Sequence, residues 1–285
     1  MQSNSSALYA SRKRTNQIGM FLSMVAMALG LVALLWILIV LFGNGLAALD
    51  WSIFVNDTPA PGSEGGGLRN AMVGSLMIVG LAVLVSTPVG ILAGIYLTEY
   101  GDSSKTAEFT RFITDIMLSA PSIVLGLFVY AIAVATIGNF SGYAGSMALA
   151  LIAIPVVMRT TENMMRLVPG SLREAAFALG APRWKVTTMV TLRAARSGVI
   201  TGLLLAVARI SGETAPLLFT ALNNQFFSTD MSRPMANLPV VIFQFAMSPY
   251  ENWIRLAWAG ALVITLTVLL LNILARVFFR DKTTG

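Results

Sequence analysis

Residues 18–42 read IGMFLSMVAMALGLVALLWILIVLF, a run of 25 residues without a charged side chain. An α-helix needs about 20 apolar residues to cross the hydrocarbon core of a bilayer, because each residue adds about 1.5 Å along its axis. Arg12, Lys13 and Arg14 stand directly before the run. A cleavable signal peptide has a shorter apolar segment, of about 7–15 residues. The run therefore predicts an uncleaved transmembrane helix, preceded by a cytoplasmic tail over residues 1–17.

The whole chain shares this apolar character. Of its 285 residues, 56% are hydrophobic and 11% are charged, and the mean hydropathy is +0.77. A soluble domain carries about 25% charged residues, so the composition excludes an ordinary soluble globule. The 24 glycines allow neighbouring helices to approach closely within lipid. We expect an all-α integral membrane protein, a bundle of transmembrane helices.

Five more apolar stretches follow the first and bring the predicted number of crossings to six. Their approximate bounds are 71–96, 112–137, 144–158, 198–222 and 253–277. Residues 43–70 contain two prolines, a glycine triplet and three acidic side chains, which predict a periplasmic or extracellular loop. Residues 223–252, with three prolines, are expected to form a second outer segment. The transmembrane core is then 71–277.

Basic residues gather in three segments, 12–14, 159–196 and 276–282. The second of them carries seven basic and two acidic side chains, a net charge of +5. Lys and Arg are enriched in cytoplasmic loops, so all three segments are expected on that side. Six crossings then place both termini in the cytoplasm, with a C-terminal tail at 278–285. The net charge of +6 is explained by membrane orientation, without a nucleic-acid partner.

The absence of two residue types removes much catalytic chemistry. The chain has no Cys and no His, which excludes thiolate or imidazole metal sites and histidine proton relays. No G-x-x-x-x-G-K-[ST] stretch occurs, so the chain has no phosphate-binding loop of that type. We therefore expect no catalytic residues, no metal and no cofactor in this chain, which is predicted not to be an enzyme.

The basic segment 159–196 contains a short helical stretch, SLREAAFALG, at residues 171–180. Gly180, followed by Pro182, predicts the end of this helix. Glu174 supplies a charge, and Ala175 and Ala176 a flat surface, which together suit docking onto a soluble partner. A plain interfacial helix that links two crossings fits the same residues.

A second stretch, ARISGETAPLLFT at residues 208–220, places charges inside the fifth crossing. Arg209 lies 11 residues past Gly198, about 16 Å along the helix and near the bilayer centre. An arginine at that depth costs about 2.5–3.5 kcal/mol on insertion scales. Glu213 follows four residues later on the same helical face, so the two charges can pair. Gly212 and Pro216 predict a bend or break beside them.

Two interpretations of this pair remain open. In one, Arg209 and Glu213 form a structural ion pair that locks the bundle. In the other, the guanidinium of Arg209 attracts an anion that crosses the membrane, and Glu213 keeps that anion from binding too tightly. Ser211 and Thr214 would then add hydroxyl donors to the pathway.

The motif Glu174-Ala175-Ala176, followed by Gly180, resembles the EAA loop of the permease subunits of ABC importers. Three further stretches, together with residues 208–220, are similar to the phosphate branch of that family: 239–243, 247–251 and 255–260. The resemblance implies a type I importer bundle, like that of the methionine importer permease. It also implies that Glu174, Ala175, Ala176 and Gly180 belong to a cytoplasmic coupling helix that docks onto an ATPase.

The resemblance further implies a function and a set of partners. The chain would be half of the translocation pathway of an ATP-driven phosphate importer in a bacterial or archaeal plasma membrane. Its partners would be a second, related permease subunit, a dimer of ATP-binding subunits that holds ATP and Mg²⁺, and an external phosphate-binding protein. The alternatives are an ABC importer for sulfate, molybdate or phosphonate, a secondary transporter or channel, and a membrane scaffold that transports nothing.

Overall fold

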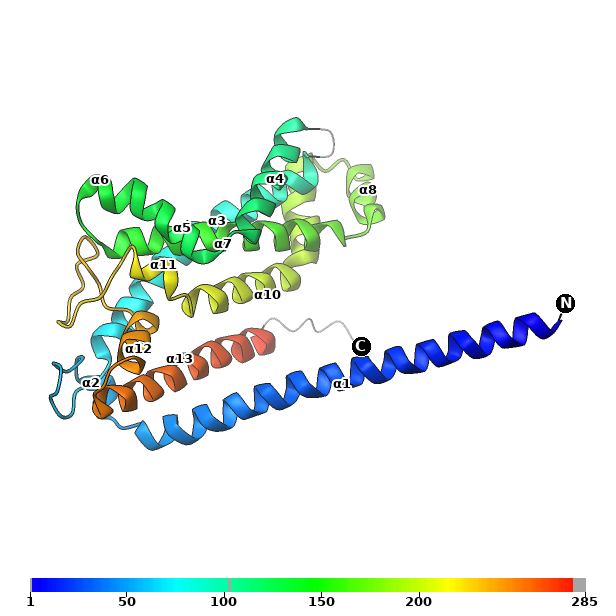
Figure 1. Ribbon diagram of the computed structural model, residues 1–285. Coiled ribbons are helices and arrows are strands. Elements are labelled where there is room, and N and C mark those ends of the chain that lie inside the picture. Colours follow the sequence, from blue (N-terminus) through cyan, green and yellow to red (C-terminus); the bar gives the residue numbers. More distant parts are fainter. Residues whose placement is uncertain (1, 102–103, 279–285) are drawn as a thin grey trace.

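The computed structural model describes residues 2–101 and 104–278, and every regular element in that part of the chain is a helix (Figure 1). The expected all-α class is therefore confirmed. Of the predicted C-terminal tail, residues 279–285 lie outside the described residues. The elements are α1 (Gln2–Ala48), α2 (Ser52–Val55), α3 (Arg69–Glu99), α4 (Lys105–Ser119), α5 (Ser122–Val129), η1 (Tyr130–Val134), α6 (Ala135–Ile137), α7 (Gly142–Arg166), α8 (Gly170–Ala178), α9 (Arg183–Lys185), η2 (Val186–Thr191), α10 (Leu192–Ser211), α11 (Ala215–Leu218), α12 (Leu238–Ala246) and α13 (Glu251–Phe278).

Five helical stretches within the described chain are long and apolar enough to cross a membrane. They are Arg12–Ala48, Arg69–Glu99, Gly142–Arg166, Arg183–Ser211 and Glu251–Leu274. The predicted third crossing is instead a bent pair, Lys105–Ser119 and Ser122–Ile137, with an angle of 107° between them. Pro121 explains the bend, because a proline disfavours helical backbone at the residue before it, and Ala120 is indeed extended.

The two ends of the bent pair lie at opposite ends of the molecule. Near its start, Arg111 donates to Glu162, in the last turns of α7. Just after its end, Asn139 donates to the carbonyl of Ser232, in the predicted outer segment. The pair thus runs the whole length of α7, and counting it as one crossing gives the six that the sequence predicts.

The core forms where α3, α7 and α10 approach closely. Gly90 and Gly94 of α3 face α7, and a β-carbon at Gly94 would lie 2.8 Å from the carbonyl oxygen of Met158. On its other flank, α7 places Thr160 against Gly202 of α10. Of the 18-residue apolar stretch of α7, 67% is buried inside the molecule, so α7 is the central helix of the bundle.

Helix α1 lies along the edge of the bundle and extends well beyond it (Figure 1). Gly45, near its C-terminal end, packs against Leu262 of α13, whereas apolar residues from Ile18 to Ile37 are largely exposed. Such an apolar surface is suited to lipid or to another membrane subunit. The helix begins at Gln2, so the predicted N-terminal tail continues the first crossing without a break.

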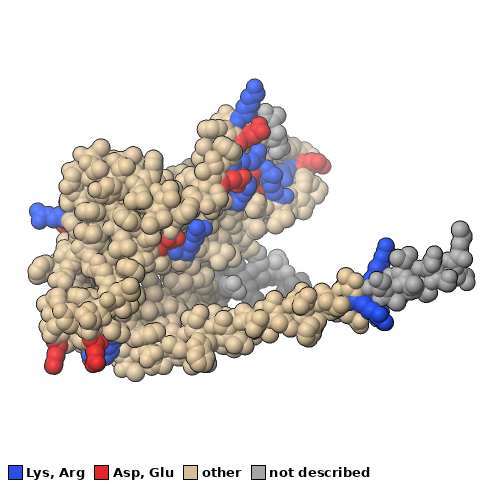
Figure 2. All heavy atoms as spheres, in the orientation of Figure 1, with Lys and Arg blue, Asp and Glu red and all other residues tan. Residues whose placement is uncertain are grey.

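Two other predicted crossings have different bounds in the structure. The fourth, expected over 144–158, is α7 and runs on to Arg166, because arginines from α4 and α7 pair with Glu162 and so satisfy its charge. The fifth, expected over 198–222, begins at Arg183 and ends at Ser211. Figure 2 shows charged side chains mainly at the two ends of the molecule, with a largely uncharged belt between them.

Candidate functional site

The helix break predicted in the fifth crossing lies between α10 and α11. α10 ends at Ser211, residues 212–214 are not helical, and Pro216 falls in the first turn of α11. Proline has no N–H, so it fits the first turn of a helix but cannot continue α10. Gly126 of α5 packs directly on Pro216, where a β-carbon would lie 2.6 Å from the proline Cα. The break is thus held against α5.

The charged residues flank this break. The Nε atom of Arg209 lies 3.7 Å from Oε1 of Glu213, and among the described residues the guanidinium makes no hydrogen bond. The Arg209 side chain is 44% exposed and that of Glu213 is 16% exposed. An arginine fork with free N–H groups can bind an oxyanion bidentately. The pair is therefore loose and leaves most donors of Arg209 available.

The two predicted hydroxyl residues are not gathered around this pair. Ser211 donates to the carbonyl of Val207 at 2.7 Å and lines an apolar groove of about 430 Å³ between α3, α10 and α13. The carbonyl of Thr214 accepts bonds from Leu217 and Leu218. Within the described chain, neither hydroxyl is hydrogen-bonded to Arg209 or Glu213. Because the crossing begins at Arg183, Arg209 also lies near the end of its helix, not at its middle.

The second predicted site, the EAA motif, forms α8 at the opposite end of the bundle (Figure 1). No residue of α8 is buried, and Glu174 and Ala175 are exposed. Gly180 follows the helix with φ at +75°, and Ala181 N–H bonds to the carbonyl of Ala176. This left-handed glycine with a bond back to the last turn is the Schellman type of helix ending. α8 is thus a short, largely exposed helix with a defined end, as a docking element requires.

The sequence of this bundle matches a known protein family. Residues 86–282 match the family described as binding-protein-dependent transport system inner membrane component. The phosphate transport system permease protein PstA of Yersinia pestis is 59% identical over 96% of this chain and 92% of its own length. The PstA protein of Pasteurella multocida is 57% identical over 95% of this chain and 97% of its own length.

The chain belongs to the PstA family of these inner membrane transport components. A structure titled as an inward-facing conformation of the MetNI methionine ABC transporter has the same fold. That chain is 20% identical, with a TM-score of 0.59 over 75% of this chain and 94% of its own length. The expected type I importer fold and the role as an ABC importer permease subunit are confirmed, against a secondary transporter, a channel or a scaffold. The family description makes this chain a multi-pass inner membrane component of a transport system that depends on a binding protein.

One charged cluster of this PstA-family chain was not predicted from the sequence. Glu162 is 2% exposed and accepts from Arg111 at 2.8 Å and from Arg166 at 2.7 Å. Arg159 lies 3.6 Å from the same carboxylate and bonds to Asp115 at 2.6 Å. Arg166 is at i+4 from Glu162, a spacing that predicts the pair. Arg111 is 51 residues away, and no sequence signal indicates it.

The opposite, outer end of the molecule is held by polar contacts across the two predicted outer segments. Arg69 pairs with Asp57 through two bonds, at 2.9 and 3.0 Å. Asn70, which is buried, donates to Thr58 and to the carbonyl of Asn224. In the exposed loop beyond, the hydroxyl and N–H of Ser232 donate to Asp230 and lower the pKa of that carboxyl. The bonds of Arg69 and Asn70 join both outer segments to the start of α3.

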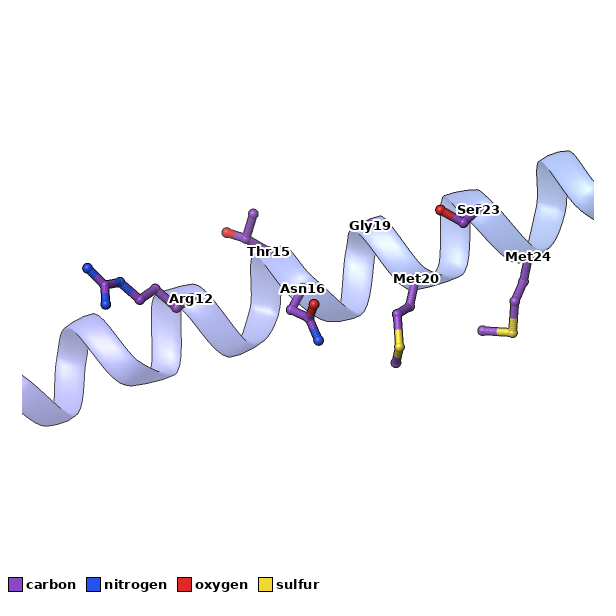
Figure 3. A pocket seen from close by; sticks show the side chains of 7 residues that line it. All are labelled: Arg12, Thr15, Asn16, Gly19, Met20, Ser23 and Met24. Carbon is purple, nitrogen blue, oxygen red and sulfur yellow. The ribbon is translucent and has the colours of Figure 1, made fainter. Parts of the chain in front are cut away.

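A further hollow lies away from all these groups. Its lining side chains all belong to α1, and Figure 3 shows them along one flank of that helix: Arg12, Thr15, Asn16, Gly19, Met20, Ser23 and Met24. None of the residues of the charged pair or of α8 contributes to it. The hollow therefore adds nothing to the candidate site.

Proposed function

We propose that this chain is the permease subunit of an ATP-driven phosphate importer and forms half of its translocation pathway. The observation that carries the substrate assignment is Arg209, whose half-exposed guanidinium is held by a single carboxylate contact of 3.7 Å beside a helix break. A phosphate oxygen pair matches the free edge of that fork. The phosphate transport named for the PstA relatives supports the same substrate.

In this proposal, Glu213 competes with phosphate for Arg209. A pathway must bind its substrate weakly enough to release it, and a neighbouring carboxylate provides that weakening. Residues 212–214 leave backbone groups outside any helix, which is tolerated at membrane depth only next to protein or water. Gly212 and Pro216 create the break, and Ser211 and Thr214 supply further hydroxyls when the bundle rearranges.

The energy arrives through α8. We propose that Glu174, Ala175, Ala176 and Gly180 dock into an ATPase subunit, which binds ATP and Mg²⁺, while this chain binds no cofactor of its own. The other partners are a second, related permease subunit and an external phosphate-binding protein that approaches the outer segments. Both termini then lie in the cytoplasm of a bacterial or archaeal cell, as the basic segments favour.

Uptake of radiolabelled phosphate tests the proposal, in cells that lack this chain and are complemented with variants. Wild type restores uptake, whereas Arg209→Gln lowers it at least about tenfold, equivalent to about 1.4 kcal/mol. Lys105→Gln, which removes an exposed positive charge at the start of α4, is the matched control and leaves uptake unchanged. Uptake of labelled sulfate and of labelled molybdate is measured in parallel. If the wild-type chain restores uptake of another oxyanion and not of phosphate, the phosphate assignment is wrong. If Arg209→Gln restores normal phosphate uptake, Arg209 and Glu213 form a structural ion pair.

A further inference from the structure

Helix α8 is held to the bundle by polar contacts instead of a hydrophobic anchor. It packs against η2, but none of its residues is buried. Arg173, in its second turn, is the side chain that reaches back toward the bundle. Its guanidinium donates to the carbonyl of Met165 at 2.9 Å and to that of Val168 at 3.2 Å, at the end of α7. Its Nε also lies 3.3 Å from Oε1 of Glu99, the last residue of α3.

The other end of the segment that contains α8 contacts the same residue. Arg183, the first residue of α9, donates to the backbone carbonyl of Glu99 at 3.0 Å. The guanidinium carbon of Arg183 lies 4.9 Å from the ring centre of Tyr100, a cation–π distance. The end of α3 thus contacts one arginine from each end of the segment Gly170–Arg183, with the exposed α8 between them.

The ion pair of Glu99 and Arg173 has poor geometry for a purely stabilising contact. The side chain of Glu99 is 7% exposed, yet Oε1 of Glu99 and Nε of Arg173 are both buried without a hydrogen bond. Buried charges are stabilising only when further hydrogen bonds satisfy them. A cavity of about 430 Å³ adjoins the pair and is lined by Thr98, Glu99, Arg166, Arg173, Phe177 and Arg183. The pair therefore has room to tighten or shift when α8 moves.

Helix α3 connects this contact to the rest of the molecule. Near its inner end, Gly94 packs closely against Met158 and Thr161 of α7, so a displacement of α3 is passed on to α7. At its outer end, Arg69 and Asn70 bond to the outer segments. Its 31 residues span about 46 Å at 1.5 Å per residue, from the side of α8 to the outer loops.

We propose that Glu99 is a positioning residue for coupling, which clamps both ends of the segment Gly170–Arg183 to α3. Its carboxylate lies against Arg173, and its backbone carbonyl accepts a hydrogen bond from Arg183. Movement of α8 then reaches α3 directly and not only through the chain connection to α7. The inference rests on the proposed function, in which α8 docks onto the ATPase. Glu99 touches neither substrate nor nucleotide in this scheme. Loss of the Glu99 carboxylate therefore leaves ATP hydrolysis and phosphate binding intact but uncouples phosphate import from ATP hydrolysis.

The test uses the whole transporter complex in proteoliposomes, with phosphate import and ATP hydrolysis measured together. Glu99→Gln is expected to lower import per ATP hydrolysed at least about fivefold, the lower end of usual coupling effects. Glu108→Gln, which changes an exposed carboxylate of α4, is the matched control and keeps the wild-type ratio. An unchanged ratio in Glu99→Gln overturns the clamp. A wild-type complex that imports no phosphate overturns the proposed function instead.

A second measurement separates positioning from a folding defect. The chain has no cysteine, so Glu99→Cys with Arg173→Cys introduces the only two thiols. A bifunctional methanethiosulfonate reagent joins them, and a reductant releases them again. The cross-linked complex should import more phosphate per ATP hydrolysed than the reduced complex and should approach the wild-type ratio. Because both forms are measured on one sample of folded protein, a folding defect cannot explain the difference. Equal ratios in the joined and reduced forms would overturn the clamp.

Discussion

At the scale of single residues, Glu162 shows how this bundle holds a buried charge. Its carboxylate, 2% exposed, receives hydrogen bonds from α4 and from its own helix, and a third arginine lies 3.6 Å away. Arg111 also donates to the carbonyl of Leu97, so the same cluster reaches α3. A carboxylate paired in this way joins three helices at one point.

Replacing Glu162 with glutamine should destabilise the protein. Gln keeps the size of the side chain but leaves the arginines without a counter-charge, and removal of one partner of a buried pair costs about 3 kcal/mol. The midpoint of thermal unfolding in detergent should fall by roughly 5–10 °C. Glu108→Gln makes the same chemical change at an exposed site and should leave the midpoint within about 1 °C of wild type. Equal midpoints for both variants would show that the Glu162 cluster is not stabilising.

At the scale of elements, two glycines of the α8 segment differ in one property. Gly170 and Gly180 both face open space, but only Gly180 has a positive φ, at +75°. A non-glycine residue in that conformation costs roughly 1–2 kcal/mol. The end of α8 therefore depends on the backbone of Gly180 and not on room for a side chain.

We expect Gly180→Ala to reduce phosphate-dependent stimulation of ATP hydrolysis several-fold, because the Schellman ending shifts and α8 loses its docking pose. Asn tolerates the left-handed conformation, so Gly180→Asn should retain more stimulation than Gly180→Ala. Gly170→Ala is the control and should behave as wild type. The comparison is made on the purified complex at saturating ATP. Normal uptake with the much larger Gly180→Trp would exclude a role of this position in docking.

Helix α3 offers a second pair of glycines, at the contact with α7. A β-carbon at Gly94 would lie 2.7 Å from Thr161 Cβ, whereas Gly80 has nothing within 4 Å. Gly94→Ala should cost about 1–3 kcal/mol, the usual cost of overpacking. Gly80→Ala should be neutral or stabilise by up to about 1 kcal/mol, since alanine is the better helix former. Thermal unfolding of the two variants checks this, and a neutral Gly94→Ala would mean that α3 and α7 can separate freely.

At the scale of the whole molecule, local signals in the sequence predicted the crossings, and contacts between distant residues determined the rest. Uncharged runs such as 18–42 predicted the long helices. The i, i+4 spacing predicted that Arg209 and Glu213 can pair, and Nε of Arg209 lies 3.7 Å from Oε1 of Glu213. The bend at Pro121 was not predicted, since hydrophobicity alone does not distinguish a straight crossing from a bent one. The contact between Glu99 and Arg173 joins residues 74 positions apart, and no spacing rule reaches that far.

The bent pair α4 and α5–α6 determines the topology, because its two ends fix which loops share a side. If it crosses the membrane, Asn139 lies outside with Thr229, and Glu108 lies inside with Ser171. If it enters and leaves on one side, Asn139 and Glu108 share that side. Asn139 donates to the carbonyl of Ser232 in the second predicted outer segment, which favours a crossing. All four residues are exposed and the chain has no cysteine, so single cysteines can be placed at each of them.

A membrane-impermeant maleimide then distinguishes the two topologies in right-side-out vesicles. We expect labelling of Asn139→Cys and Thr229→Cys in intact vesicles, and of Glu108→Cys and Ser171→Cys only after permeabilisation. Phosphate uptake by each variant controls for correct insertion. Protection of Asn139→Cys together with Glu108→Cys would make the bent pair a re-entrant loop. The number of crossings would then be five, and the two termini would lie on opposite sides of the membrane. The segment around α8 would share a side with only one of the two basic terminal segments. Lys and Arg are enriched on the cytoplasmic side, which argues against this five-crossing topology.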